Sequence, residues 1–217
     1  MSIKNKVKNL KTLGSIALIA IESFLVPVPK AYALDGNIKY VHTKDVANSY
    51  VEASAFYKLP GKISGFTFVD FLNGKGYFAK TSLEKNVASV VNAKAQLVHA
   101  NEPTTQAGVG VSAVIPHMPK NTFAKVSVMP LWFDAYGRVK DKVIVGYFGS
   151  VDLPMGFELS SFGEWNIGAE GGPKWAYGEI ELGKNIGPVN VSYNPALVGD
   201  GDAIPRLEHR VSAKIDF

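Results

Sequence analysis

Residues 206–217, RLEHRVSAKIDF, decide the fold of this chain because polar and apolar side chains alternate through the stretch. The odd-numbered side chains are apolar with one exception, His209. The even-numbered side chains are charged, apart from Ser212. Successive side chains of a β-strand point to opposite faces, so this pattern predicts one strand with an apolar face and a charged face. The charged face meets water in a soluble sandwich, whereas in a membrane barrel it faces the lumen and the apolar face meets lipid.

The last residue, Phe217, distinguishes these two interpretations. A strand that ends on Phe after Val211, Ala213 and Ile215 resembles the assembly signal of outer-membrane barrels in Gram-negative bacteria. The resemblance implies that the barrel-assembly machinery recognises the chain through Phe217, Ile215, Ala213 and Val211. It also implies outer-membrane lipid around the folded chain, so we favour the membrane barrel over the soluble sandwich.

Residues 1–33 have the layout of a secretory signal peptide. Lysines precede an apolar run over residues 13–21, and Ala31-Tyr32-Ala33 provides a small-residue cleavage site, although Glu22 interrupts the apolar region. The run is too short for the roughly 20 residues that a membrane-spanning helix needs. We therefore expect a cleaved signal at 1–33, export to the outer membrane, and a single barrel domain over 34–217.

The predicted mature chain has balanced charge. Residues 1–33 contain five lysines and one glutamate, and the remaining residues carry 18 basic and 18 acidic side chains. A basic chain would favour nucleic acid as a partner, and this balance removes that argument. The chain has no cysteine, which excludes disulfides, thiolate metal sites and thiol nucleophiles. We expect no cofactor and no metal.

Turn-forming residues divide the chain after residue 33 into short alternating segments, as in an all-β, antiparallel, up-and-down transmembrane β-barrel. The predicted strands are 37–43, 48–57, 63–72, 76–83, 88–99, 107–115, 123–133, 140–148, 156–167, 174–183, 188–194 and 206–217. Closure favours an even number, and we predict twelve, with eight or ten as alternatives. Twelve strands place both ends on the periplasmic side and the longest connection, 195–205, outside the cell.

Two further sets of residues follow from the strand pattern. Aromatic residues near strand ends are expected in the interfacial girdles of the barrel, and they are Tyr57, Tyr77, Trp132, Tyr147, Trp165 and Tyr193. Residues of the other parity are expected to line the lumen: Tyr50, Glu52, Phe56, Phe66, Phe68, Asp70, Phe78, Lys80, Glu84, Lys94, Lys125, Lys142, Glu158, Glu164, Trp175, Tyr177, Glu179, Glu181, Arg206, Arg210 and Lys214. Aromatic rings beside hydrogen-bonding groups can hold a flat polar solute. The candidate substrate contacts are therefore Phe66, Phe68, Asp70, Tyr50, Glu52, Trp175, Tyr177, Glu179, Arg210 and Lys214. In the alternative interpretation, Phe66 and Phe68 simply fill a narrow interior.

Four segments together are similar to Tsx-type nucleoside-specific channels: residues 65–71 (GFTFVDF), the turn 74–77 (GKGY), residues 174–183 and the closing strand. The similarity is one of layout over most of residues 34–217, without a diagnostic motif, and the chain is shorter than is usual in that family. The resemblance implies a twelve-stranded channel in which Phe66, Phe68 and Asp70 contact a base and a ribose. Long gating loops are in doubt because the chain is short.

The leading functional hypothesis is a channel for small polar solutes, with nucleosides as one candidate. A closed structural or adhesive barrel is the first alternative. The second is a lipid hydrolase that uses Ser161 and His209, which both have lipid-facing parity, but no hydrolase motif surrounds them, so we expect no enzyme activity. The closely spaced carboxylates of Asp200 and Asp202 could bind calcium, although a Gly-Asp turn is commonly only a solvated turn.

Overall fold

The computed structural model describes residues 34–44, 48–101, 105–168, 172–199 and 204–217. The predicted signal peptide and the Asp200–Asp202 turn lie outside these residues. Among the described residues, no helix is long and apolar enough to cross a membrane.

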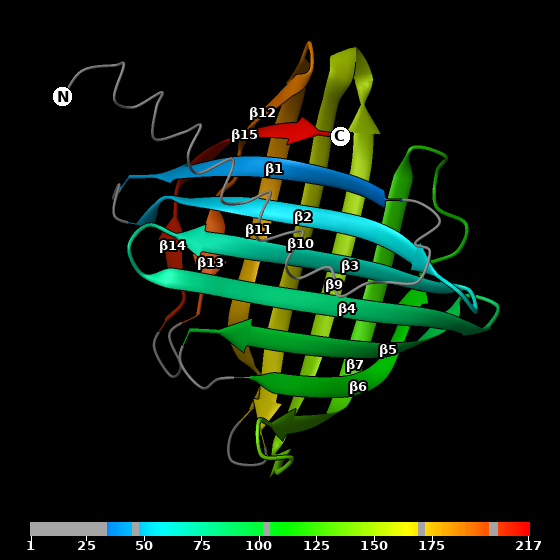
Figure 1. The fold of residues 1–217 in the computed structure, drawn as a ribbon. Helices are drawn as coiled ribbons and strands as arrows, with labels where there is room; N and C mark the ends of the chain where they lie inside the picture. Colours follow the sequence, from blue (N-terminus) through cyan, green and yellow to red (C-terminus); the bar gives the residue numbers. More distant parts are fainter. Residues whose placement is uncertain (1–33, 45–47, 102–104, 169–171, 200–203) are drawn as a thin grey trace.

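Strands make up nearly all of the described structure (Figure 1). They are β1 (Leu34–Thr43), β2 (Tyr50–Leu59), β3 (Ile63–Leu72), β4 (Gly76–Ala88), β5 (Val91–Ala100), β6 (Gln106–Val114), β7 (Thr122–Asp134), β8 (Val139–Lys140), β9 (Lys142–Leu153), β10 (Phe157–Gly168), β11 (Lys174–Ile186), β12 (Val189–Tyr193), β13 (Ala196–Val198), β14 (Arg206–Glu208) and β15 (Arg210–Asp216).

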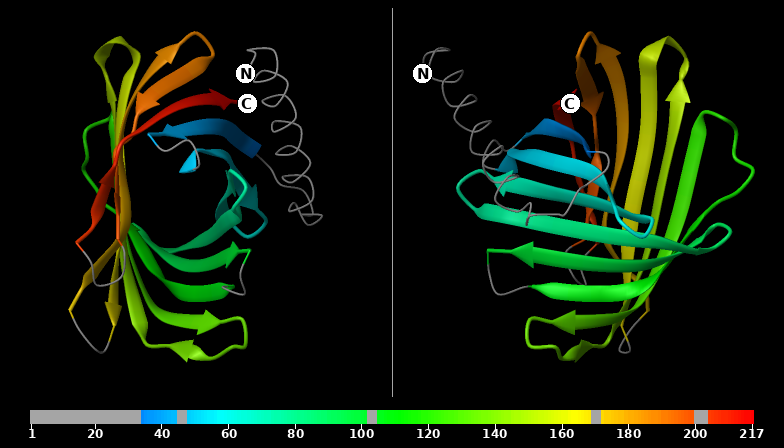
Figure 2. Two further views of the ribbon diagram at one scale, coloured as in Figure 1. Left: turned by 90° about the vertical axis from the view of Figure 1, so that its left-hand side faces the viewer. Right: turned by 45° about the vertical axis from the view of Figure 1, so that its right-hand side comes forward.

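These segments form one closed antiparallel wall of twelve strands, as the alternating sequence predicts. Neighbours in the chain pair in order from β2 to β11, β1 pairs with both β2 and β15, and β12 joins β11 to β15. The segments β12 and β13 are two parts of one wall strand, as are β14 and β15, and β8 extends the pairing of β7. The wall bends so strongly that β1 to β6 cross in front of β9 to β12 (Figures 1 and 2).

Several strands are longer than the sequence predicts: β4 and β9 each end five residues beyond their predicted ends at 83 and 148. The predicted strand 188–194 continues as β13 beyond Pro195, so the connection expected at 195–205 is shorter. Pro195 has no N–H to donate to the ladder, but its carbonyl oxygen accepts a hydrogen bond from the Ile180 N–H at 3.1 Å. Pairing therefore resumes directly after the proline.

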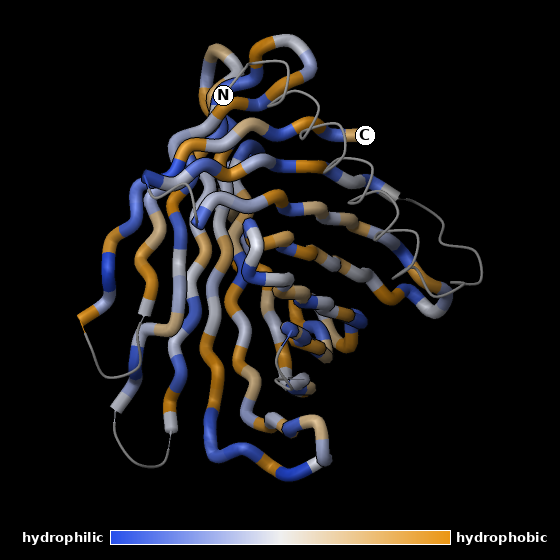
Figure 3. The backbone as a smooth tube through the Cα atoms, turned by 60° about the vertical axis from the view of Figure 1, so that its left-hand side comes forward, coloured by the Kyte–Doolittle hydropathy of each residue, from blue (hydrophilic) through white to orange (hydrophobic). Residues whose placement is uncertain are grey.

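The two faces of the wall differ in chemistry, and hydropathy alternates along the strands (Figure 3). Outward side chains are apolar and exposed in this isolated chain, for example Val111, Val211 and Ile215. Buried polar side chains such as Ser112, Asn190 and Ser212 belong to the opposite face. An apolar exterior around a polar interior is the arrangement of a transmembrane barrel.

A β-bulge corrects the predicted position of Trp132. Val109 pairs with Leu131 but Val111 pairs with Val128, so Gly110 on β6 faces two residues of β7. The extra residue reverses the alternation of β7, and it coincides with Pro130, which cannot donate to the ladder. Trp132 therefore points inward and is 1% exposed, whereas the sequence places it in the outer aromatic girdle.

The same bulge requires glycine at position 110. A Cβ atom on Gly110 would lie 2.1 Å from the carbonyl oxygen of Val128. We expect Gly110→Ala to lower the free energy of unfolding by about 1–3 kcal/mol, since overpacking forces the backbone to shift. The matched control is Gly149→Ala, whose Cβ would meet its nearest atom at an ordinary 3.6 Å. Urea unfolding of both variants in detergent measures the difference, and equal stabilities would contradict this account of the bulge.

Candidate functional site

The interior of the barrel is the candidate site, and strand register determines which residues reach it. Directly paired residues share a face of the wall. Lys39 on β1 pairs with Glu52, Glu52 pairs with Asp70, and Asp70 pairs with Phe78, so all four side chains point to the same face. The same argument applied around the wall places nearly all of the predicted lumen residues inside. The predicted residues that the register places inside are Tyr50, Glu52, Phe56, Phe66, Phe68, Asp70, Phe78, Lys80, Glu84, Lys94, Lys125, Lys142, Glu158, Glu164, Tyr177, Glu179, Glu181, Arg206, Arg210 and Lys214.

Trp175 is the exception, and its predicted position in the lumen is wrong. A register shift between Glu164 and Trp165 makes Trp175 pair with Trp165 on the outer face. The two indoles meet edge to face with centroids 4.7 Å apart, and Trp175 Nε1 donates to the carbonyl oxygen of Leu197 at 2.7 Å. The Trp165 ring also lies 5.7 Å from that of Tyr147, so Trp175 belongs to the outer aromatic cluster.

Arg210 is the centre of a buried network on one side of the interior. Its side chain is 8% exposed, and its Nη2 donates to Glu208 Oε2 at 2.7 Å. Its Nη1 donates to Glu179 Oε2 at 3.3 Å and to the hydroxyl oxygens of Tyr50 and Tyr177. The network thus links β15 to strands on both sides of it.

Lys39 extends this network from β1. Its Nζ donates to Glu181 Oε2 at 2.7 Å and lies 3.6 Å from Glu179 Oε1. Glu181 also accepts from the Ser192 hydroxyl at 2.6 Å, and Glu179 accepts from the amide of Asn194 at 3.1 Å. The sequence interpretation missed Lys39, although it has the inward parity of its strand, whereas it placed Glu208 on the charged, inward face of the closing strand.

A second charged cluster lies on the far side of the interior. Lys125 Nζ donates to Glu84 Oε1 at 3.0 Å, and Lys94 Nζ lies 3.9 Å from the same oxygen. Lys80 on β4 forms an ion pair with Glu164 on β10. Cations and carboxylates are thus interleaved, so neither charge sign dominates these two clusters.

Aromatic rings form a continuous row across β2, β3 and β4, which we call the phenylalanine row: Phe56, Phe66, Phe68 and Phe78. Successive ring centroids are 4.4, 5.9 and 5.9 Å apart. Phe56 is 52% exposed, so the row is still partly accessible to solvent. Such a row offers apolar ring faces beside the polar groups of the interior.

Asp70 lies beside the phenylalanine row. It pairs across the strands with Glu52 on one side and Phe78 on the other. Among the described residues, its buried Oδ1 has no hydrogen-bond partner. The structure therefore brings together Phe66, Phe68, Asp70, Tyr50 and Glu52 of the predicted substrate contacts on adjacent strands, and it adds Tyr177, Glu179 and Arg210 through the Arg210 network. Lys214 lies near them on β15, opposite Lys39.

The structure does not assemble the hydrolase pair suggested by parity. The Ser161 hydroxyl is hydrogen-bonded to that of Tyr147 at 3.1 Å, and His209 Nδ1 is hydrogen-bonded to the Tyr193 hydroxyl. Ser161 lies on β10 and His209 lies between β14 and β15, with two wall strands between them. At about 4.8 Å per strand spacing, roughly 14 Å separates them along the wall, so they do not form a nucleophile–base pair.

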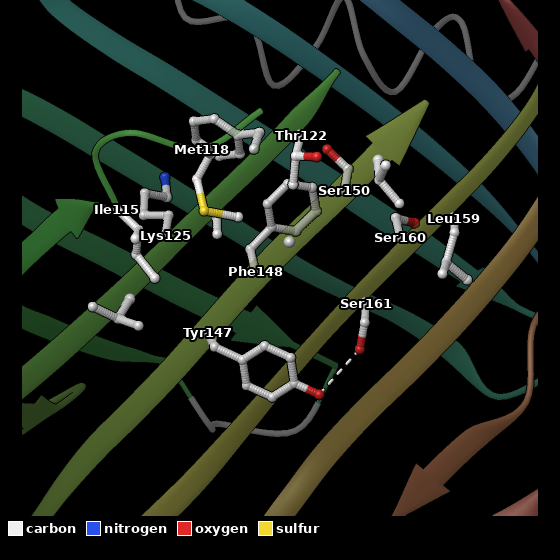
Figure 4. A pocket seen from close by; sticks show the side chains of 15 residues that line it. Ile115, Met118, Thr122, Lys125, Tyr147, Phe148, Ser150, Leu159, Ser160 and Ser161 are labelled. Carbon is white, nitrogen blue, oxygen red and sulfur yellow. Dashed lines mark hydrogen bonds between the residues drawn. The ribbon is translucent and has the colours of Figure 1, made fainter. Parts of the chain in front are cut away.

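A shallow depression of about 320 Å³ lies near the turn end of β7, β9 and β10 (Figure 4). On the outer face it lies over Ala124, Gly149 and Ser161, small residues that pair with one another across the three strands. Most of its exposed lining is apolar. It is therefore a feature of the apolar exterior, separate from the charged interior.

No family model and no curated protein sequence matches this chain. Solved structures of porins do match. The KdgM porin in complex with disordered oligogalacturonate has 5% identity and a TM-score of 0.57, over 84% of this chain and 98% of that chain. The NanC porin has 9% identity and a TM-score of 0.56, over 84% of this chain and 99% of that chain.

At these identities the likeness concerns the fold, so the chain has the barrel fold of small outer-membrane porins. The matched structures give no support to the Tsx-type resemblance.

Proposed function

We propose that this protein is an outer-membrane channel through which small polar solutes cross the bilayer. The observation that carries the proposal is the closed twelve-strand wall with an apolar outer face and charged, hydrogen-bonding side chains inside. Lipid offers no partners to backbone N–H and C=O groups, so strands can span it only in a closed barrel. An outer-membrane location also accords with the porin fold and with the signal peptide expected at 1–33.

The number of strands favours a channel over a closed barrel. An interior of eight strands is just filled by side chains, whereas larger barrels leave room for ligands or water. One observation favours the closed structural alternative: Val98, Met129, Trp132 and Ile144 pack together inside the wall and fill part of the interior. An experiment must therefore show whether solutes pass through the barrel or whether its side chains close the interior.

Liposome swelling makes that distinction. Purified protein reconstituted in liposomes is diluted into isotonic solutions of a neutral monosaccharide, a nucleoside, galacturonate, or a dextran too large for any twelve-strand barrel. Galacturonate is included because one matched porin structure contains oligogalacturonate, and the nucleoside tests the Tsx-type resemblance. We expect swelling with at least one small solute and none with dextran. Folded protein that admits none of them would favour the closed barrel.

A further inference from the structure

The ion pair between Lys80 and Glu164 crosses the interior. The shorter way round the wall from β4 to β10 passes through β5, β6, β7 and β9, which is five strand steps. In a wall of twelve, strands directly opposite each other are six steps apart. Lys80 Nζ nevertheless contacts Glu164 Oε1, and the two residues are 84 positions apart in the chain. Two side chains from nearly opposite strands of the wall thus meet inside the lumen.

Packed side chains occupy the interior on one side of this pair. The strands β5, β7 and β9 contribute Val98, Met129, Trp132 and Ile144, which pack together inside the wall. Met129 and Trp132 are each 1% exposed. Lys142 Nζ covers the Trp132 ring at 4.7 Å from its centre. A solute finds little room in this part of the interior.

The other side of the pair is bounded by aromatic rings. Phe68, a member of the phenylalanine row, pairs with Lys80 across β3 and β4. Tyr177 pairs with Glu164 across β10 and β11, and its hydroxyl accepts a hydrogen bond from Arg210. The remaining passage therefore runs between the Lys80–Glu164 pair and a wall that carries Phe68, Tyr177 and Arg210.

We propose that the Lys80–Glu164 ion pair is the constriction that sets the size limit of the channel. This inference rests on the proposed channel function. The two opposite charges compensate each other where they meet, so the pair obstructs the lumen without favouring either ion sign. Lys125 and Glu84 form a comparable pair, but they lie on strands only three steps apart and so do not span the lumen.

Single-channel recording of paired variants tests this constriction. We expect the double variant Lys80→Ala, Glu164→Ala to raise the unitary conductance by about two-fold or more. The reason is that the width of a pore and the groups that line it determine how readily ions pass through it. The control, Lys125→Ala with Glu84→Ala, removes the same charges and similar bulk and should change conductance less. The exchanged pair, Lys80→Glu with Glu164→Lys, should restore conductance close to that of the original chain. Heat-modifiable migration on gels verifies that each variant is folded.

The outcomes separate this inference from the channel function itself. If the original chain conducts and the Lys80→Ala, Glu164→Ala variant has the same unitary conductance, the constriction is overturned and the channel function stands. The same conclusion follows if the conductance of the control rises equally. An original chain that is silent together with all of its folded variants overturns both. A silent original chain that conducts only after Lys80 and Glu164 are truncated would show that the pair blocks the lumen.

Discussion

Replacing Arg210 with methionine is expected to lower the free energy of unfolding of the barrel by about 3–5 kcal/mol, the usual cost of removing one partner from a buried ion pair. The substitution keeps a long side chain but removes the donors that serve Glu208, Glu179 and two tyrosine hydroxyls. Glu179 is 6% exposed, and within the described part of the chain Lys39 would be its one remaining ion-pair partner. Its negative charge would then be incompletely compensated in a buried position.

The control for Arg210 is Arg206→Met. Arg206 has the same inward parity and also pairs with Glu208, but its side chain is 68% exposed. An exposed ion pair contributes about 0–1 kcal/mol, so this variant should remain close to the original chain. Urea unfolding in detergent, followed by tryptophan fluorescence, measures both. Equal effects of the two substitutions would contradict a central role for the Arg210 network.

Replacing Phe217 with alanine is expected to deplete folded protein from the outer membrane. The Phe217 N–H donates to the carbonyl oxygen of Gly36 at 2.9 Å, and the Gly36 N–H donates to that of Phe217 at 3.1 Å. The aromatic ring lies over Gly36, where a Cβ would come within 2.8 Å of it. Phe217 therefore completes the seam between β1 and β15. The Phe217 side chain is 60% exposed in the isolated chain, so we expect its contact to contribute less than a fully buried side chain, which contributes about 1.5–3 kcal/mol.

Gly36→Val separates this seam contact from the recognition by assembly machinery that the sequence of the C-terminal strand predicts. It displaces the Phe217 ring and leaves the C-terminal strand unchanged. If the ring acts through the seam, both variants should fold poorly into liposomes without any machinery. If recognition dominates, Phe217→Ala should fold normally in liposomes and fail only in cells. Asp216→Asn, on the opposite face of the strand, is the control, and normal amounts of folded Phe217→Ala in the outer membrane would contradict both roles.

Alternation of side chains, together with the turn residues and the final Phe217, predicts the barrel, its twelve strands and most of the inward-facing residues. It failed where one strand gains a residue relative to its partner. The alternation places Trp132 outside and Trp175 inside, whereas the structure has Trp132 inside and Trp175 outside. A one-residue shift reverses every later side chain in the strand. Pro130 is a local signal for the first bulge, because proline within a strand is confined to edges and bulges.

Contacts inside the lumen lay beyond prediction from the sequence. Whether Lys80 meets Glu164 depends on the closure, tilt and bending of the whole wall, which periodicity along single strands does not encode. Lys39 shows a milder form of the same limit. Its inward parity is readable from the first strand, but its partners Glu179 and Glu181 become neighbours only when β1 pairs with the end of the chain.

Single-channel recording of the purified, folded protein in a planar lipid bilayer is the most direct test of the channel. The structure predicts stepwise conductance increments in simple salt, with little preference for either ion because the two charged clusters mix lysine, arginine and glutamate. Bilayers that stay silent, although liposome controls show that the protein has inserted and folded, would contradict the channel and identify the molecule as a closed barrel.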